Sequence, residues 1–140
     1  MAVESKQDVN YILTFGYGNR TNYDAFLEYI KEFKVTCIID VRLSPRAWSR
    51  KWYGSQLEKV CNANDIKYIS MPSLGNTSGT NKWTPPDVEE ADRALLEVSN
   101  IAKLGTVLLL CGEMDSRRCH RVDVANQLHK LTHAPIKNLE

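Results

Sequence analysis

Residues 108–121, with the sequence LLLCGEMDSRRCHR, concentrate reactive side chains at the end of an apolar run. They supply two thiols, a carboxylate, an imidazole and a guanidinium group, namely Cys111, Cys119, Glu113, His120 and Arg121. Thiolates act as nucleophiles, carboxylates and imidazoles transfer protons, and guanidinium groups bind anions. We therefore predict a small enzyme whose catalytic residues are Glu113, Cys119, His120 and Cys111.

Cys119 is the thiol most suited to form a thiolate. It begins a predicted helix that runs to about Leu131, and three arginines surround it at positions 117, 118 and 121. A helix N-terminus and neighbouring cations both lower the pKa of a thiol. His120 would point roughly 100° away around a helix, so it need not pair with Cys119. An inert cysteine that fills space against the sheet is the alternative.

Two other chemistries fit the same segment less well. Cys111 and Arg117 have the C-x5-R spacing of cysteine phosphatase loops. However, Glu113 and Asp115 would place two negative charges in a loop that must bind a dianion. The cysteines and His120 could also bind zinc, but their spacing is not a usual zinc pattern and the arginines would oppose a cation. We therefore predict no metal.

The elements that must position these residues alternate between strands and helices. Strands are predicted at residues 11–15, 35–41, 66–71 and 106–111, with a short final strand at 135–139. Helices are predicted after N-caps at Thr21 and Thr84, at 53–64 and at 119–131. This alternation indicates one α/β domain spanning residues 1–140, with its core at about 10–133. We expect three α/β/α layers and a mostly parallel sheet of four to five strands.

Further polar residues follow the other predicted strands. Parallel sheets bind ligands at the carboxyl ends of their strands, so these side chains are expected to meet residues 111–121 in one cleft. The predicted substrate-binding residues are Asn19, Asp40, Arg42, Arg46, Gly75 and Arg121. Within this set the arginines would hold an anion. Asn19, together with His120 of the predicted catalytic residues, would serve as an orienting group in the cleft. For Asp40, a structural pair with Arg42 is at least as strong an interpretation.

The segment between Val41 and Leu57 is basic and aromatic. It contains no acidic residue, and Trp48, Trp52 and Tyr53 lie among its cations. Arginine forks bind phosphate, and aromatic rings can stack on a base or sugar. We therefore predict an anionic, phosphate-bearing substrate such as a nucleotide or a nucleic-acid end. The alternatives are a non-catalytic nucleic-acid-binding module and a cysteine-dependent, phosphatase-like or thiol enzyme.

Four segments in register carry a family resemblance: FGYGNRT, DVRLSP, LG and LLCGE…CHR. In this order and spacing, from about Tyr11 to Leu131, the chain resembles the domain of unknown function 488 family. The resemblance implies an α/β domain with an active cleft formed by these motifs, but no particular reaction. The motif positions are Gly16, Asn19, Asp40, Arg42, Pro45, Leu74, Gly75, Cys111, Glu113, Cys119, His120 and Arg121. Asn76 and Ser116 stand where the family often has glycine and proline.

The composition of the chain limits which partners, cofactors and cellular locations we expect. The net charge of +1 argues against a bulk polyanion binder, although a small anionic ligand or nucleic acid stays possible as a partner. The apolar runs are too short to cross a membrane. The four cysteines are expected to be reduced, and the protein cytoplasmic. Neither a dinucleotide fingerprint nor a P-loop occurs, so no cofactor is predicted.

Overall fold

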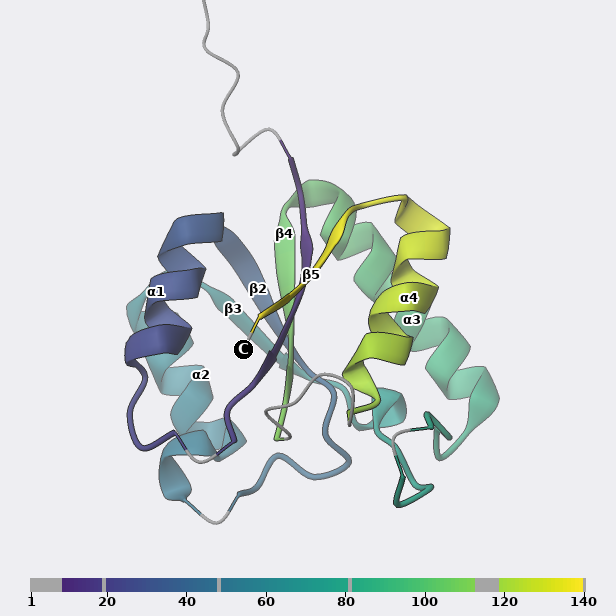
Figure 1. The fold of residues 1–140 in the computed structure, drawn as a ribbon, viewed down its shortest axis with the longest axis horizontal. Coiled ribbons are helices and arrows are strands. Elements are labelled where there is room, and N and C mark those ends of the chain that lie inside the picture. Colours follow the sequence, from purple (N-terminus) through teal and green to yellow (C-terminus); the bar gives the residue numbers. More distant parts are fainter. Residues whose placement is uncertain (1–8, 19, 48, 81, 113–118, 140) are drawn as a thin grey trace, which may run out of the picture.

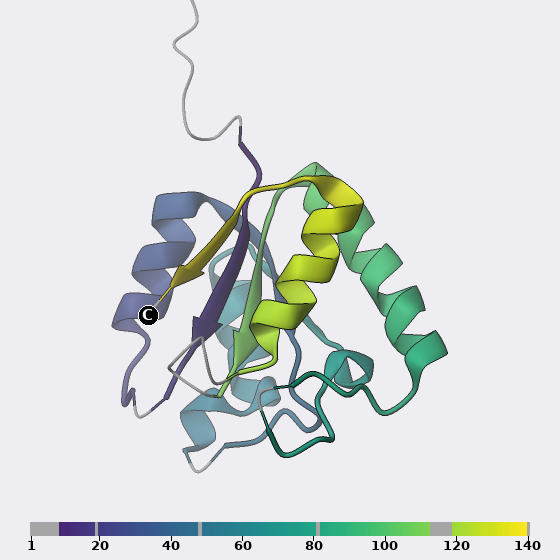
Figure 2. The same ribbon diagram turned by 45° about the vertical axis from the view of Figure 1, so that its right-hand side comes forward.

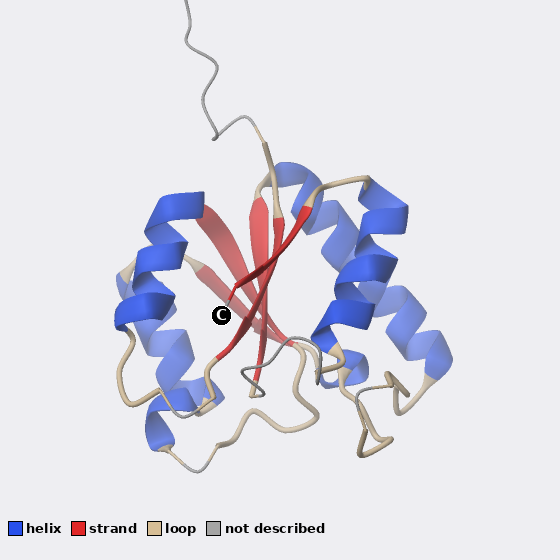
Figure 3. Cartoon of the chain, viewed as in Figure 1, coloured by secondary structure: helices blue, strands red, loops and turns tan. Residues whose placement is uncertain are grey.

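The computed structural model describes residues 9–18, 20–47, 49–80, 82–112 and 119–139. Within them, five parallel strands form one sheet in the order β3-β2-β4-β1-β5 (Figures 1 and 3). The strands are β1 (Ile12–Gly16), β2 (Val35–Asp40), β3 (Lys67–Ser70), β4 (Thr106–Cys111) and β5 (Ile136–Leu139). The predicted parallel sheet is therefore confirmed, including the short final strand.

Helices cover both faces of this sheet, which gives the predicted three layers (Figures 1 and 2). The helices are α1 (Asp24–Phe33), α2 (Gly54–Ala63), α3 (Val88–Leu104) and α4 (Arg121–Thr132), with short 3-10 turns η2 (Arg50–Trp52) and η3 (Pro72–Leu74). Helices α1 and α2 pack on one face, and α3 and α4 pack on the other. No helix in the described residues is both long and apolar enough to span a bilayer.

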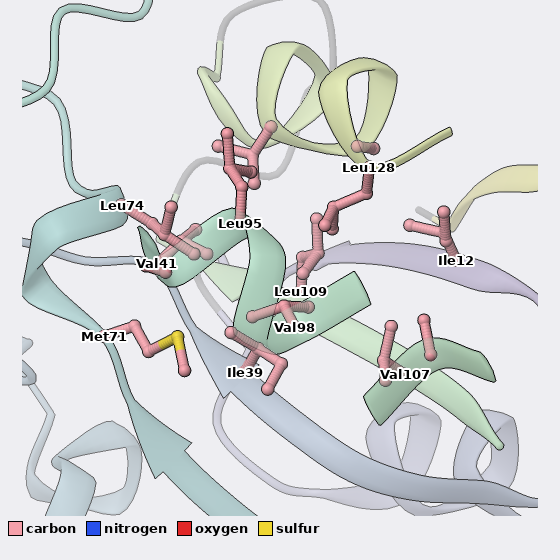
Figure 4. Close-up of a cluster of buried hydrophobic side chains, with 14 of the residues drawn as sticks. Ile12, Ile39, Val41, Met71, Leu74, Leu95, Val98, Val107, Leu109 and Leu128 are labelled. Carbon is pink, nitrogen blue, oxygen red and sulfur yellow. The ribbon is translucent and has the colours of Figure 1, made fainter. Parts of the chain in front are cut away.

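Each face of the sheet has its own apolar core because alternate strand residues point to opposite sides. In β4, Val107 and Leu109 face α3 and α4, whereas Leu108 and Leu110 face α1 and α2. Figure 4 shows the first of these cores, in which Leu128 of α4 packs over the sheet. All six residues of β4 are buried, as expected of a central strand that is covered on both faces.

Both predicted threonine N-caps are wrong. Helix α1 begins after Tyr23, which makes no side-chain cap; instead the Asn22 side chain accepts a hydrogen bond from the Asp24 N–H. Helix α3 begins after Asp87, whose carboxylate accepts a hydrogen bond from the Glu90 N–H at 3.0 Å. Because a residue before proline is driven to extended backbone, the Pro85-Pro86 pair delays the helix until Asp87.

The strand order places the end of β4 at a topological switch point. β4 lies between β2 and β1, which lead into α2 and α1 on one face of the sheet. β4 itself leads into α4 on the opposite face. Neighbouring strands whose connections leave in opposite directions open a crevice at their carboxyl ends, where ligands bind in open α/β sheets. Cys111 is the last residue of β4 and therefore lies at this crevice.

Candidate functional site

Two cysteines and a histidine come together at the end of β4. The Sγ atoms of Cys111 and Cys119 lie 2.7 Å apart, and Nδ1 of His120 lies 3.8 Å from Sγ of Cys119. All three residues are buried, with at most 8% of their surface exposed. We call Cys111, Cys119 and His120 the thiol cluster. The sequence-based prediction that these residues share a site is consistent with this geometry.

The thiol cluster lines a cavity of about 400 Å³. The remaining lining residues come from the loops after β2 and β3 and from the end of β4, and they are Arg42, Leu43, Ser44, Asn76, Thr80 and Gly112. The volume falls in the range of small-molecule sites, roughly 300–1,000 Å³. Of these six, only Arg42 is among the predicted site residues, because nothing in a loop sequence shows which side of the loop faces a cavity.

The contacts of Nε2, the ring nitrogen that points away from Cys119, determine the tautomer of His120. Nε2 lies 3.0 Å from the carbonyl oxygens of both Val41 and Leu74. A carbonyl oxygen can only accept, so Nε2 must carry a hydrogen. In the neutral ring, Nδ1 is then the proton acceptor, and this is the atom that faces Cys119. His120 is thus oriented to take the proton of the Cys119 thiol.

His120 lies beside Cys119, a pairing that the sequence left open. Within a regular helix, successive side chains diverge by roughly 100°. Helix α4 begins only at Arg121, so Cys119 and His120 precede its first turn. His120 is the N-cap residue of α4, and the side chains of Cys119 and His120 converge there.

The surroundings of Cys119 stabilise its thiolate. The hydrogen bond between Cys119 and Cys111 is the largest influence, and it lowers the pKa of Cys119; burial opposes it. His120, the backbone N–H of Arg121 and the positive charge of Arg121 each lower this pKa further. The net result is a thiol whose pKa lies well below the ordinary value. The predicted thiolate is therefore supported by contacts from both sides of the crevice.

The other two cysteines, Cys37 and Cys61, show how the pKa of a thiol changes where burial is the largest influence. Burial raises the pKa of Cys37 to about 11 and that of Cys61 to about 12. Cys37 lies in the core under α3 and α4, and Cys61 lies in the core under α2. These thiols pack as small apolar side chains and provide internal controls for the reactivity of Cys119.

Asp40 and Arg42 form a buried ion pair. Nε and Nη2 of Arg42 donate to the two carboxylate oxygens at 2.8 and 2.6 Å, and the Tyr68 hydroxyl donates to the same carboxylate at 2.5 Å. Nη1 of Arg42 lies 2.8 Å from the carbonyl oxygen of Trp52. The structural interpretation of Asp40 therefore describes its contacts well. Binding of an anion by Arg42 remains a prediction, since its fork holds Asp40 here.

The expected stacking role of Trp52 is wrong. Trp52 is fully buried, and its ring lies parallel to that of Tyr17 with centroids 5.0 Å apart. Phe26 and Tyr23 contact it edge-on, and its indole N–H donates to the carbonyl of Arg20. The ring forms part of the core between α1 and the sheet and is not available to a base. Trp48 lies outside the described residues.

The other predicted site residues are placed as follows. Arg46 is exposed, and its carbonyl accepts a hydrogen bond from Arg42. Arg121 is fully buried directly after the thiol cluster, and its backbone N–H points to the Cys119 sulfur. Gly75 is buried at the end of η3 and does not line the cavity itself. Asn19 and Glu113 lie outside the described residues, so their roles remain predictions.

Gly75 supports the cavity through a close approach to Leu43. A Cβ atom at Gly75 would lie 2.5 Å from Cδ2 and 2.9 Å from Cα of Leu43. We expect Gly75→Ala to cost about 1–3 kcal/mol of stability, because the main chain at a cavity-lining residue must move. Urea denaturation checks this, with Ser55→Ala on the exposed surface of α2 as the control. An unchanged midpoint for Gly75→Ala would contradict the argument.

The thiol cluster also meets the minimum requirement for a metal site. One ligand atom from each of Cys111, Cys119 and His120 lies within 4.8 Å of the others. Two thiolates on one tetrahedral zinc would have sulfurs about 3.8 Å apart, given a Zn–S distance of about 2.3 Å. The observed separation is 2.7 Å, and the charge of Arg121 acts on Cys119. The sulfurs are therefore too close together to serve as two ligands of one tetrahedral zinc ion.

Together, the fold and the cluster define an α/β protein with a cysteine pair at the switch point of a parallel sheet. A family model described as domain of unknown function DUF488 matches residues 22–128, and the chain belongs to this family. The match includes the ion pair, Gly75 and the whole thiol cluster. No curated protein and no solved structure matches the chain.

Proposed function

We propose that this protein is a small cysteine-dependent enzyme in which the Cys119 thiolate attacks an anionic, phosphate-bearing substrate bound in the cavity. The observation that carries the proposal is the environment of the Cys119 sulfur. It contacts the Cys111 thiol, Nδ1 of His120 and the Arg121 N–H, and it lines the cavity. An activated thiolate next to a proton acceptor that is itself oriented by hydrogen bonds is the arrangement that nucleophilic catalysis requires.

The proposed step follows from these contacts. The thiolate of Cys119 forms a bond to phosphorus, and the bond between phosphorus and the leaving oxygen breaks. The leaving oxygen takes a proton from a general acid, for which His120 and the sequence-predicted Glu113 are the candidates. Water then cleaves the cysteinyl intermediate and releases phosphate. The charge and N–H of Arg121 stabilise the negative charge in this region, and Ser44, Asn76 and Thr80 offer polar lining groups.

The alternative of a nucleic-acid-binding module has less support. It depended on Trp48, Trp52 and Tyr53 among the arginines, and of these Trp52 is fully buried against Tyr17. Arg42 in turn is engaged by Asp40. The contacts of the described residues thus favour chemistry at the thiol cluster over stacking on a strand of nucleic acid.

Protection of Cys119 by phosphate tests the substrate class. Labelling of Cys119 by iodoacetamide, followed by peptide mass, should slow severalfold in the presence of inorganic phosphate or a mononucleotide. Arg46→Gln should weaken this protection, since Arg46 is the exposed arginine next to the cavity-lining loop. Arg93→Gln is the matched control, because Arg93 is an exposed arginine on α3 beside a separate cavity. Equal labelling with and without phosphate would overturn the phosphate-bearing substrate.

A further inference from the structure

In the phosphoryl step Cys111 only helps to stabilise the Cys119 thiolate and forms no bond, yet it is in direct contact with the nucleophile. Its Sγ lies 2.7 Å from that of Cys119, and a disulfide joins sulfurs about 2.05 Å apart. Cys111 is held at the end of the central strand, where its carbonyl accepts a hydrogen bond from the Tyr17 N–H. Cys119 approaches from the start of α4 on the other side of the crevice. A small movement of one side chain would join the two sulfurs.

We propose that Cys111 and Cys119 form a working dithiol that reduces small disulfides, with Cys119 as the attacking thiol and Cys111 as the resolving thiol. This inference rests on the nucleophile of the proposed function but not on its phosphate-bearing substrate. It assigns to the cavity a second substrate class, low-molecular-weight disulfides. It also gives Cys111 a chemical role, that of the resolving thiol, in addition to its packing in the core.

The reaction balances in two exchanges. The Cys119 thiolate attacks one sulfur of the substrate, the substrate S–S bond breaks and a mixed disulfide forms. The departing half takes the proton that Nδ1 of His120 had accepted from Cys119 and leaves as a thiol, so Nδ1 is again a proton acceptor. The Cys111 thiol then gives up its proton and attacks Sγ of Cys119, which releases the second half of the substrate as a thiol. The protein dithiol loses two electrons and the substrate gains them. An external low-molecular-weight thiol reduces the Cys111–Cys119 disulfide and closes the cycle.

The cluster supplies the proton acceptor for the second exchange. The atoms Sγ of Cys111, Sγ of Cys119 and a ring nitrogen of His120 all lie within 4.8 Å of one another. Nε2 is committed to the carbonyls of Val41 and Leu74, so Nδ1 is the nitrogen that faces the sulfurs. Once Cys119 has entered the mixed disulfide, Nδ1 is the adjacent base for the Cys111 proton.

The size of the cavity and the burial of the two cysteines favour a small disulfide. A volume of about 400 Å³ is far more than a peroxide needs, since a water molecule occupies only about 30 Å³ in the liquid. Cys111 and Cys119 are only 8% and 6% exposed, so a bulky folded protein cannot easily present its own disulfide to them. A small, flexible disulfide can enter, and the polar groups of Ser44, Asn76 and Thr80 suit one that carries charge.

Titration of the reduced full-length protein with oxidised glutathione tests the inference. The wild type should release two equivalents of glutathione and yield a Cys111–Cys119 disulfide, read by mass spectrometry of peptides without reduction. Cys111→Ser should release one equivalent and retain glutathione on Cys119. Cys119→Ser should do neither. Cys37→Ser and Cys61→Ser are matched controls, which should behave like the wild type, and circular dichroism verifies that each variant is folded.

Other outcomes separate the two proposals. A wild type that retains glutathione on Cys119 with a free Cys111 thiol would overturn the dithiol and leave the nucleophile intact. A Cys119 that reacts neither with oxidised glutathione nor with iodoacetamide would overturn both. If the purified protein carries a stoichiometric zinc ion whose removal frees both thiols, the pair is a metal site and the dithiol is overturned. If Cys111→Ser does not fold, Cys111→Ala replaces it, with the same retained adduct expected.

Discussion

The rate at which iodoacetamide labels Cys119 is expected to stay nearly constant between pH 6 and pH 9. Over the same range, an ordinary thiol with a pKa of about 8.5 gains on the order of 200-fold in thiolate and thus in rate. The hydrogen bond between Cys119 and Cys111, with the contacts to His120 and Arg121, lowers the pKa of Cys119. Because this pKa is lowered, the thiolate is present throughout the range and is lost only when the pH falls well below 8.5.

Labelling resolved by peptide mass provides the measurement and its controls together. Cys37 and Cys61 should remain unlabelled until urea unfolds the protein, because burial raises the pKa of both and encloses them in the core. In His120→Gln, the pH at which labelling of Cys119 is half-maximal should rise, because the Nδ1 contact is removed. A half-maximal pH near 8.5 in the wild type would contradict the assignment of Cys119 as an activated thiol.

Asp40→Asn is expected to lower the free energy of unfolding by about 3–5 kcal/mol. Asp40 is fully buried and Arg42 is 7% exposed, so the substitution leaves a buried guanidinium without its counter-charge. For a chain of this size the corresponding fall in melting temperature is roughly 10 °C or more. Urea denaturation followed by circular dichroism measures the effect.

Three further variants isolate the ion pair as the cause. Asp65→Asn makes the same chemical change at an exposed position and should change stability by less than about 0.5 kcal/mol. Tyr68→Phe removes one hydrogen bond to Asp40 and should cost about 1 kcal/mol. The double variant Asp40→Asn, Arg42→Met removes both charges and should recover part of the loss. If Asp40→Asn is no more destabilising than Asp65→Asn, the pair does not hold the loop.

The fold was predictable because its signals are local and periodic. The apolar run at residues 106–111 defines a buried strand, and the structure places β4 at those same residues. The helix starts were less predictable, since they depend on competition between neighbouring caps. Asp87, and not Thr84, is the N-cap of α3 because two prolines lie between them. This result follows from the backbone sterics of residues before proline, which a search for capping residues alone does not consider.

The site was predictable in its residue types but not in its contacts. The sequence places Cys111, Cys119 and His120 in one segment, and the chain brings them together. It does not reveal that His120 binds two main-chain carbonyls, because the apolar side chains of Val41 and Leu74 give no sign of what their carbonyls contact. Nor does the abundance of arginine after β2 show that Arg42 turns back to Asp40.

The anchoring of His120 has a consequence for how the sequence can vary. Its Nε2 is held by carbonyl oxygens, which every residue type possesses, and not by side chains. Positions 41 and 74 can therefore exchange one apolar residue for another as the core is repacked, while the ring keeps its proton on the same nitrogen. Position 120 has no such freedom. Related chains should therefore vary among apolar residues at positions 41 and 74 and keep histidine at position 120. Substitutions that repack the core would then leave the chemistry of the crevice unchanged.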